Sequence, residues 1–171
     1  MALAPRIVGG VVAALALGAD QAHKTWMLHG MDIGANGPVS LAPFLDLVLV
    51  WNKGVSYGLF AQNSDYGRWF LIAISVFAAI LFSVWLLRSS NKLAAISLGL
   101  IIGGALGNGL DRIIYGAVAD FFHFHIGTFS WYVFNLADIW IVAGVAGLMY
   151  DNLVRRPGNA TNVGESSGSE D

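Results

Sequence analysis

The sequence is poor in charged residues and has no cysteine. Only 12% of its 171 residues are Asp, Glu, Lys or Arg, whereas 56% are hydrophobic. Soluble domains carry about 25% charged residues, so a bilayer is a better solvent for this surface than water alone. The missing cysteine excludes disulfides, thiolate catalysis and Cys-ligated metals. The formal net charge of −2 gives no sign of a basic patch, so we expect no nucleic-acid partner.

Four apolar stretches approach the roughly 20 residues that cross a bilayer as a helix. In lipid each must be helical, because a helix satisfies its own backbone polar groups. A cleaved signal peptide is the alternative for the first stretch, but its apolar run continues past the Ala-Leu-Ala sequence at 14–16. We predict an all-α membrane protein with four transmembrane helices, at about Ile7–Leu28, Trp69–Leu87, Leu93–Ile114 and Trp131–Tyr150.

Basic residues predict how these helices are oriented. Arg6 precedes the first span, Arg88 and Lys92 separate the second from the third, and Arg155 and Arg156 follow the fourth. With four spans these sites share one face, which the positive-inside rule makes cytoplasmic. Both termini are then cytoplasmic.

The other segments divide into a tail and an outward-facing part. We predict a membrane domain over residues 1–156 and a disordered cytoplasmic tail over 157–171, which is rich in Gly, Ser, Asn and acidic residues. On the outward side, Leu45–Val50 and Val55–Phe60 are strand-like runs around a turn-like Trp51–Gly54. This pattern predicts a small β-hairpin or sheet on the extracytoplasmic membrane surface.

Ionisable and amide side chains gather toward the outer ends of the predicted spans. Each buried charge in a membrane is costly and therefore invites a functional explanation. Structural polar residues have no need to share one depth, whereas the residues of a site do. The residues at this depth are Asp20, Lys24, Asn108, Asp111, Arg112, Asp120, Asn135 and Asp138.

Several of these residues also have structural explanations. Asp20 and Lys24 stand four apart and can form an ion pair within one helix. Asp111 can cap a helix or face water, and Arg112 can extend its charged end to the headgroups. Three small residues spaced by four predict close packing of the third span against another helix: Gly99, Gly103 and Gly107.

A metal site is a further alternative, because His123 and His125 alternate shortly after Asp120 in a short outer strand. Two His residues without a third ligand are weak grounds for a metal site. We therefore expect no metal.

Asp138 is placed by the pattern about two turns into an apolar helix, with no basic residue nearby in sequence. A buried carboxylate must find a partner or take up a proton, and Asp120 at the membrane boundary is an available partner. Two such carboxylates titrate as a coupled pair that shares a proton. The ionised member can take a proton from water while the protonated member donates to a scissile carbonyl.

Five short motifs resemble those of the bacterial lipoprotein signal peptidases (signal peptidase II). They occur in order along nearly the whole chain except its tail, so together they are specific, although each alone is weak. Two departures, Lys53 and Ile139-Trp140, bear on substrate fit and leave the Asp pair intact. The motifs are Asp20-Gln21-Ala22-His23-Lys24, Asn52-Lys53-Gly54-Val55-Ser56-Tyr57-Gly58, Gly103–Arg112, Val118-Ala119-Asp120-Phe121 and Phe134-Asn135-Leu136-Ala137-Asp138.

The resemblance implies an activity, partners and site residues. Such enzymes are aspartyl endopeptidases of the bacterial inner membrane that cut the signal peptide from prolipoproteins before a diacylglyceryl-modified Cys, without a cofactor. We thus expect prolipoprotein substrates, membrane lipid as a partner, a monomer, and a site toward the extracytoplasmic face. By motif, Asp120 and Asp138 are catalytic, and the supporting or substrate-binding positions are Asp20, Lys24, Asn52, Gly54, Asn108, Arg112, Asn135 and Ala137.

Two rival functions are consistent with charges inside a membrane. A small transporter or proton-conducting protein would need a polar path to the cytoplasmic face, yet the inner halves of the predicted spans are almost free of ionisable groups. A structural membrane protein would use its polar residues only to hold helices together, and would tolerate Asp138→Asn.

Overall fold

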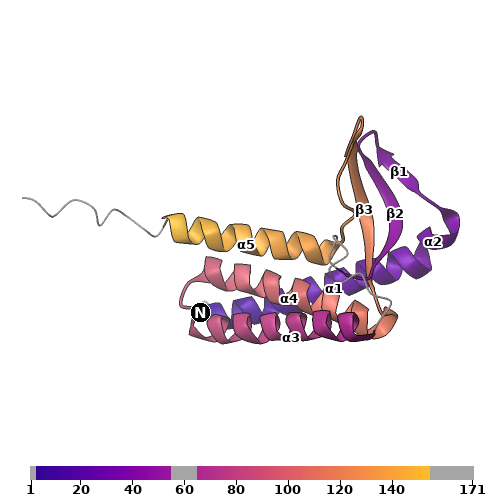
Figure 1. Ribbon diagram of the computed structural model, residues 1–171. Coiled ribbons are helices and arrows are strands. Elements are labelled where there is room, and N and C mark those ends of the chain that lie inside the picture. The colour runs from indigo at the N-terminus through magenta and orange to yellow at the C-terminus, as the bar shows by residue number, and fades with distance from the viewer. Residues whose placement is uncertain (1–2, 55–64, 155–171) are drawn as a thin grey trace, which may run out of the picture.

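Four long helices run side by side, and a β-sheet projects from one end of the bundle (Figure 1). The computed structural model describes residues 3–54 and 65–154, and this architecture refers to them. A five-residue π-helix, η1 (Trp26–Gly30), prolongs the first helix, and a short helix, α2 (Ile33–Asn36), leads into the sheet. The long helices are α1 (Pro5–Thr25), α3 (Asp65–Arg88), α4 (Lys92–Tyr115) and α5 (Leu136–Val154).

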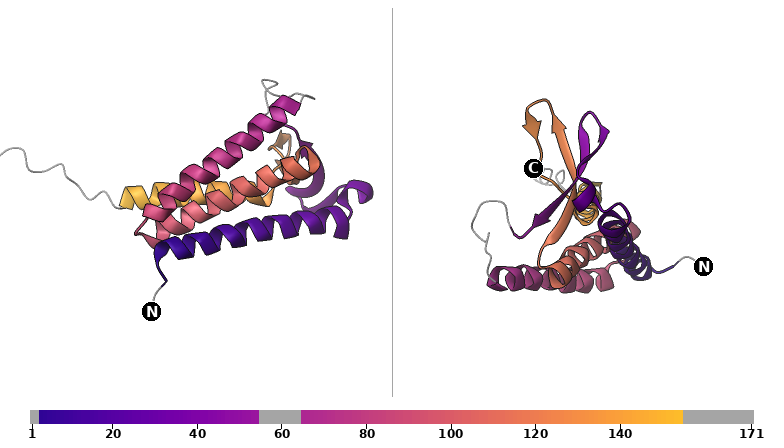
Figure 2. Two further views of the ribbon diagram at one scale, coloured as in Figure 1. Left: turned by 90° about the horizontal axis from the view of Figure 1, so that it is seen from below. Right: turned by 90° about the vertical axis from the view of Figure 1, so that its right-hand side faces the viewer.

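Helix α4 is the centre of the bundle and packs against each of the other three long helices. Figure 2 (left) shows α1 and α3 on its two sides, with α5 behind it. A Cβ atom on Gly103 would lie 2.7 Å from the Ala13 carbonyl oxygen of α1, so the two backbones can approach this closely only at a glycine. Gly99 approaches the Gly9 carbonyl oxygen of α1 in the same way, and Gly107 lies against the Asp20 side chain of α1. All three glycines therefore pack against a neighbouring helix, as predicted.

Three of the described helices are long and apolar enough to cross a membrane: Tyr66–Arg88, Lys92–Tyr115 and Leu136–Val154. Helix α1, the fourth predicted span, is not among them. Its last turns carry Asp20, Gln21, His23 and Lys24, which lower its apolar character. The lengths and compositions fit the predicted membrane fold for three of the four helices.

The N-terminal end of α1, the α3–α4 connection and the C-terminal end of α5 lie together at the end of the bundle opposite the sheet (Figure 1). At this end Asn91 caps α4, and its side-chain oxygen accepts a hydrogen bond from the Leu93 N–H at 3.0 Å. The Asn91 amide also donates to Asp151 near the end of α5. Arg6, Arg88 and Lys92 therefore share one end of the molecule, as predicted.

The sheet contains four antiparallel strands in the order β1–β2–β3–β4. The strand predicted at Leu45–Val50 is confirmed, but among the described residues it pairs with β1 and β3. The predicted small sheet is present, but it is larger than predicted, because β3 and β4 are contributed by a segment far away in sequence. The strands are β1 (Val39–Ala42), β2 (Leu45–Asn52), β3 (Val118–Ile126) and β4 (Phe129–Ser130).

The fourth helix begins at Leu136 and not at Trp131 as predicted. The preceding segment is held at the sheet instead, where the Trp131 N–H donates to the Phe124 carbonyl at 2.8 Å. Phe134 and Phe122 exchange backbone hydrogen bonds of 3.1 and 2.8 Å. These bonds keep the apolar residues before α5 in an extended conformation.

An apolar cluster seats the sheet on the end of α1. It joins η1, α2, β2 and β3, and burying one such large side chain contributes about 1.5–3 kcal/mol. The His23 ring of α1 stacks on Phe122 of β3 with centroids 5.3 Å apart. The cluster thereby fixes β3 against the helices, and its buried members are Met27, Ile33, Leu47, Ala119 and Phe121.

Two predictions fall outside the described residues. These are the second strand-like run, Val55–Phe60, and the tail over 157–171 with its boundary at residue 156.

Candidate active site

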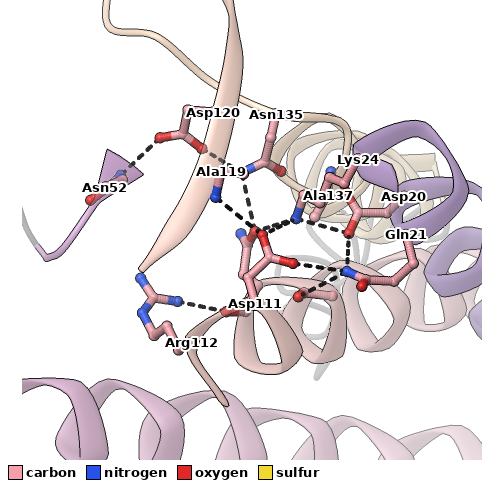
Figure 3. A network of polar contacts seen from close by, with 12 residues as sticks. Asp20, Gln21, Lys24, Asn52, Asp111, Arg112, Ala119, Asp120, Asn135 and Ala137 are labelled. Carbon is pink, nitrogen blue, oxygen red and sulfur yellow. Dashed lines mark hydrogen bonds and ion pairs between the residues drawn. The ribbon is translucent and has the colours of Figure 1, made fainter. Parts of the chain in front are cut away.

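Asp120 lies on β3 and is buried, with 2% of its surface exposed. Its Oδ1 atom accepts a hydrogen bond from the Asn135 side-chain amide at 2.6 Å. Its Oδ2 atom accepts one from the Asn52 amide of β2 at 3.0 Å (Figure 3). Asp120 sits within a strand, and its register partner on β2 is Val50. Pairing with β2 therefore holds its backbone.

Asp138 is in the first turn of α5, not two turns inside a helix as predicted. The Asp138 N–H donates to the Asn135 Oδ1 atom at 3.2 Å, and the Asn135 N–H donates back to the Asp138 Oδ2 atom at 3.2 Å. This reciprocal arrangement is a capping box, with Asn135 as the N-cap. Asp138 thus has a structural role at the helix start in addition to any chemical one.

Two amides connect the carboxyl groups of Asp120 and Asp138. The Asn135 amide that binds Asp120 also donates to the Asn108 Oδ1 atom at 3.1 Å. The Asn108 amide in turn donates to the Asp138 Oδ1 atom at 2.8 Å. The two predicted catalytic residues, from β3 and α5, therefore belong to one hydrogen-bond network with Asn108 of α4.

A buried charge cluster lies next to this network, between α1 and α4. Lys24 contacts Asp20 at 2.9 Å and Asp111 at 2.8 Å, and the three side chains are at most 2% exposed. The predicted Asp20–Lys24 ion pair is confirmed, with Asp111 as an additional member. The prediction that Asp111 caps a helix or faces water was wrong, because its carboxylate binds Lys24 inside the bundle. Lys24 also donates to the Asn108 Oδ1 atom at 3.4 Å.

The charge cluster positions the neighbours of both candidate catalytic residues. The Ala137 N–H, one residue before Asp138, donates to the Asp20 Oδ1 atom at 3.0 Å. The Ala119 N–H, one residue before Asp120, donates to the Asp111 Oδ2 atom at 3.2 Å (Figure 3). The cluster therefore fixes the backbone at β3 and at the start of α5.

Gln21 is a member of this cluster that the sequence analysis did not single out. Its amide donates to Asp20 at 3.1 Å, to Asp111 at 3.0 Å and to the Gly107 carbonyl at 3.4 Å. The signal was its place inside the Asp-x-x-x-Lys motif, one residue after Asp20. With these bonds Gln21 supplies donors to a cluster that holds two carboxylates and one cation.

Arg112 and Gly54 have narrower roles than the other predicted residues. The Arg112 Nη1 atom donates to the Asn108 carbonyl of its own helix at 3.1 Å, and within residues 3–54 and 65–154 no hydrogen bond joins it to Asp120 or Asp138. The Gly54 N–H donates to the Asn52 Oδ1 atom at 3.1 Å. Because the side-chain oxygen of Asn52 is bound to Gly54, the side-chain nitrogen of Asn52 faces Asp120.

The surroundings of Asp120 raise the pKa of its carboxyl group toward neutral pH. Burial, the largest cause, raises the pKa of Asp120 from 3.8 to about 6. The hydrogen bonds from Asn135 and Asn52 oppose this rise, whereas the charge of Asp138 adds to it. A carboxyl group with such a pKa can hold or release a proton near neutral pH.

Comparison with known proteins identifies the family. The family model for signal peptidase (SPase) II matches residues 12–154, which include every residue of the network. The chain belongs to the signal peptidase II family. This membership makes it a peptidase, and the transporter alternative is not favoured.

Curated relatives of the peptidase share much of its sequence. A lipoprotein signal peptidase of Beijerinckia indica subsp. indica is 58% identical over 149 residues, which cover 87% of this chain and 89% of the relative. A lipoprotein signal peptidase of Methylocella silvestris is 53% identical over 166 residues, covering 97% and 96% of the two chains.

Solved structures share the fold of the peptidase. A bacterial membrane enzyme determined at 2.3 Å resolution superimposes with a TM-score of 0.73 at 24% identity, covering 94% of each chain. A second such enzyme, at 1.9 Å resolution, gives a TM-score of 0.74 at 24% identity and covers 86% of this chain. Because the matched regions cover most of this chain, the shared fold includes both the helices and the sheet.

Proposed function

We propose that this chain is an aspartyl endopeptidase that removes signal peptides from prolipoproteins by cutting before the diacylglyceryl-modified Cys. Asp120 and Asp138 are its catalytic pair. The family and the curated relatives, which are lipoprotein signal peptidases, support the reaction. The observation that carries the assignment of the pair is Asn135, which hydrogen-bonds to both carboxyl groups, one through its side chain and one through its backbone.

The chemistry follows from two carboxyl groups held in one network. The ionised member of the pair takes a proton from a water molecule as that water attacks the scissile carbonyl. The protonated member, a role suited to Asp120 with its pKa of about 6, donates its proton to the carbonyl oxygen. In the collapse of the resulting gem-diol, the carboxyl group that gained the water proton passes it to the amide nitrogen and the C–N bond breaks. A gem-diol hydroxyl proton returns to the other carboxylate as the carbonyl reforms. Among the described residues, neither carboxyl group forms an ion pair with Lys, Arg or His, so neither is fixed as a structural anion.

The supporting residues act through these two groups. Asn52 and Asn135 hold the two oxygens of Asp120, and Asn108 holds Asp138. Asp20 fixes the Ala137 backbone, and Lys24 balances the charge of Asp20.

The place of the network in the bundle suits a substrate that is itself embedded in the membrane. The network lies where α4 ends, where α5 begins and where β3 crosses them, at the end of the bundle that carries the sheet (Figure 1). Arg6, Arg88 and Lys92 lie at the opposite end, which we assign to the cytoplasm of a bacterial inner membrane. We propose four spans, with α1 as the fourth, so that the scissile bond meets the pair at the extracytoplasmic boundary.

The test is a cleavage assay on a diacylglyceryl-modified prolipoprotein with the purified full chain in detergent. We expect Asp120→Asn and Asp138→Asn each to abolish product, because an amide can neither take a proton from water nor deliver one. Asp32→Asn is the matched control. Asp32 is an exposed carboxylate outside the network with a positive φ of 47°, and Asn accepts this backbone conformation.

Thermal unfolding of each variant separates lost chemistry from lost folding. The expected result is a folded, inactive protein for both site variants and full activity for the control. Cleavage by either site variant at a wild-type rate would overturn the aspartyl pair while leaving the family assignment intact.

A further inference from the structure

A second cluster of ionisable side chains lies on the sheet, apart from the network of Asp120. His123 and His125 are two residues apart on β3, so their side chains emerge on the same face of the strand. Asp46 of β2 is the register partner of His123. The two His residues alone lack a third ligand. Strand pairing supplies one in Asp46, which lies 79 positions before His125.

The three side chains converge on one small volume. One ligand atom from each of Asp46, His123 and His125 lies within 4.8 Å of the other two. The His125 Nε2 atom is 2.9 Å from the Asp46 Oδ2 atom, and the two imidazole centroids are 5.2 Å apart. In a tetrahedral zinc site with bonds of roughly 2.0–2.1 Å, the ligand atoms are about 3.3 Å apart. The present separations, 2.9 Å for one pair and at most 4.8 Å for the others, lie on both sides of this value, so binding one ion requires the side chains to move.

The chemistry of this donor set selects a particular class of ion. Two imidazoles and one carboxylate suit Zn²⁺ and neighbouring divalent transition ions, with a water molecule as fourth ligand. Mg²⁺ and Ca²⁺ prefer oxygen ligands alone and fit poorly here. Among the described residues the ion-pair partner of Asp46 is His125, so no Lys or Arg competes with a metal ion for its carboxylate.

The surroundings of the cluster resemble those of a prepared site. The Ser130 hydroxyl of the neighbouring strand lies 2.7 Å from the His123 Nε2 atom. A metal-ligating His commonly has such a partner, which sets the tautomer and orientation of the ring. The side chains of Asp46 and His125 are 25% and 27% exposed, so an ion can enter from solvent and is then partly shielded.

We propose that Asp46, His123 and His125 form a binding site for Zn²⁺ or a similar divalent transition ion. The ion is a cross-link between β2 and β3 and takes no part in peptide hydrolysis. The two strands lose regular pairing between Leu47 and Val50, and Asp120 follows at the register position of Val50. An ion at Asp46 ties the strands together on the other side of this irregularity and so stiffens the pair that carries Asp120 and Asn52.

The test uses the full chain without a polyhistidine tag, stripped of metal and held in detergent. Melting temperature is followed by tryptophan fluorescence in the presence of ZnCl₂, with MgCl₂ as the control ion. Because a ligand that binds only the folded state stabilises it, we expect the melting temperature to rise with each tenfold increase in free Zn²⁺ above the dissociation constant. Titration with Co²⁺ should give the visible absorption bands of a tetrahedral site with one ion per chain.

Variants assign the ion to these residues. His125→Gln and His123→Gln each keep a polar side chain, and each should lose the Zn²⁺-dependent shift and the Co²⁺ bands. His29→Ala removes an exposed His on η1, outside the cluster, and should keep both. The melting temperature of each variant without metal reports its fold. Absence of a Zn²⁺ shift in the wild type, or a shift that survives in both Gln variants, would overturn the site.

Discussion

The Ala137 N–H donates a hydrogen bond of 3.0 Å to the Asp20 carboxylate, although 117 positions separate the two residues. This bond connects the first helix of the chain to the first turn of the last one. Asp20 is itself held by Lys24 at 2.9 Å. The position of Asp138, one residue after Ala137, therefore depends on a charge cluster that does not touch it.

Replacing Lys24 by Met is expected to destabilise the fold strongly. Asp20 and Asp111 would remain buried without their cation, and removing one partner of a buried ion pair costs about 3–5 kcal/mol of unfolding free energy. The measurement is thermal or chemical unfolding in detergent. Lys92→Met, at an exposed Lys at the start of α4, is the control and should have little effect. Equal stability of the two variants would mean that the cluster is not held together by charge.

Asn135 caps the start of α5, and its side-chain amide also joins Asp120 to Asn108. Two substitutions distinguish these two roles. Asn135→Ser keeps a good N-cap for α5 but removes the amide that donates to Asp120 and Asn108. We expect a loss of stability of about 1–3 kcal/mol, because Asp120 and Asn108 each lose a buried donor. The rate of cleavage should fall by roughly 10²–10³, as when one positioned donor is removed from an active site.

Asn135→Ala removes both the cap and the amide that joins Asp120 to Asn108. It should show the same fall in rate together with a melting temperature lower than that of the Ser variant. A wild-type rate for the Ser variant would contradict a catalytic role of the amide.

The raised pKa of Asp120 predicts a pH dependence of stability. The folded state keeps a proton on Asp120 up to about pH 6, whereas the unfolded state releases it near pH 3.8. The protonated Asp120 carboxyl therefore adds ~3 kcal/mol to the unfolding free energy below about pH 4, and this added stability is lost as pH rises through 6. The charged groups that act on Asp120 are Asp138, which raises its pKa, and Lys24, which lowers it.

Asp120→Asn cannot titrate and should lack this dependence. The difference in unfolding free energy between variant and wild type should shift in favour of the variant as pH rises from 4 to 7. Unfolding measured at several pH values in one detergent gives this difference directly. A difference that stays constant over this range would show that the Asp120 carboxyl has an ordinary pKa in the folded protein.

The contact between α1 and α4 should be sensitive to a single methyl group. In Gly103→Ala the new Cβ would lie 2.7 Å from both the Ala13 oxygen and the Ala16 Cβ, and such overpacking costs about 1–3 kcal/mol. Gly18→Ala, on α1 with nothing within 4 Å of the added Cβ, is the matched control. Its stability should be unchanged or slightly raised, because Ala favours helix. Melting temperatures that fall equally would argue against close packing at Gly103.

The sequence was informative wherever one segment alone determines the outcome. Long apolar runs predicted α3 and α4 to within a few residues, because hydrophobicity and length decide a spanning helix. The Gly99, Gly103 and Gly107 spacing predicted a close contact, although not its partner. The candidate site was predicted because charged residues in such runs are rare enough to be noticed.

The sequence was uninformative where distant segments compete for the same residues. The apolar residues from Trp131 onward suit a helix by composition, but backbone bonds to Phe124 and Phe122 hold them at the sheet. The partners of Asp111 were equally hidden, since Gln21 lies 90 positions away. Asp120 lies on a strand only because β2 is there to pair with it. Local propensity cannot supply such information.

The capping box at the start of α5 has a consequence for how the enzyme is made. Ribosomes deliver Asp20, Asn108 and Asp120 to the membrane before Asn135 exists. Until then Asp120 lacks its 2.6 Å donor and its partner Asp138. With Asp120 and Asp138 as the proposed catalytic pair, a nascent chain that has not reached Asn135 is expected to be inert toward the precursors around it, and proteolytic competence to arrive only with α5.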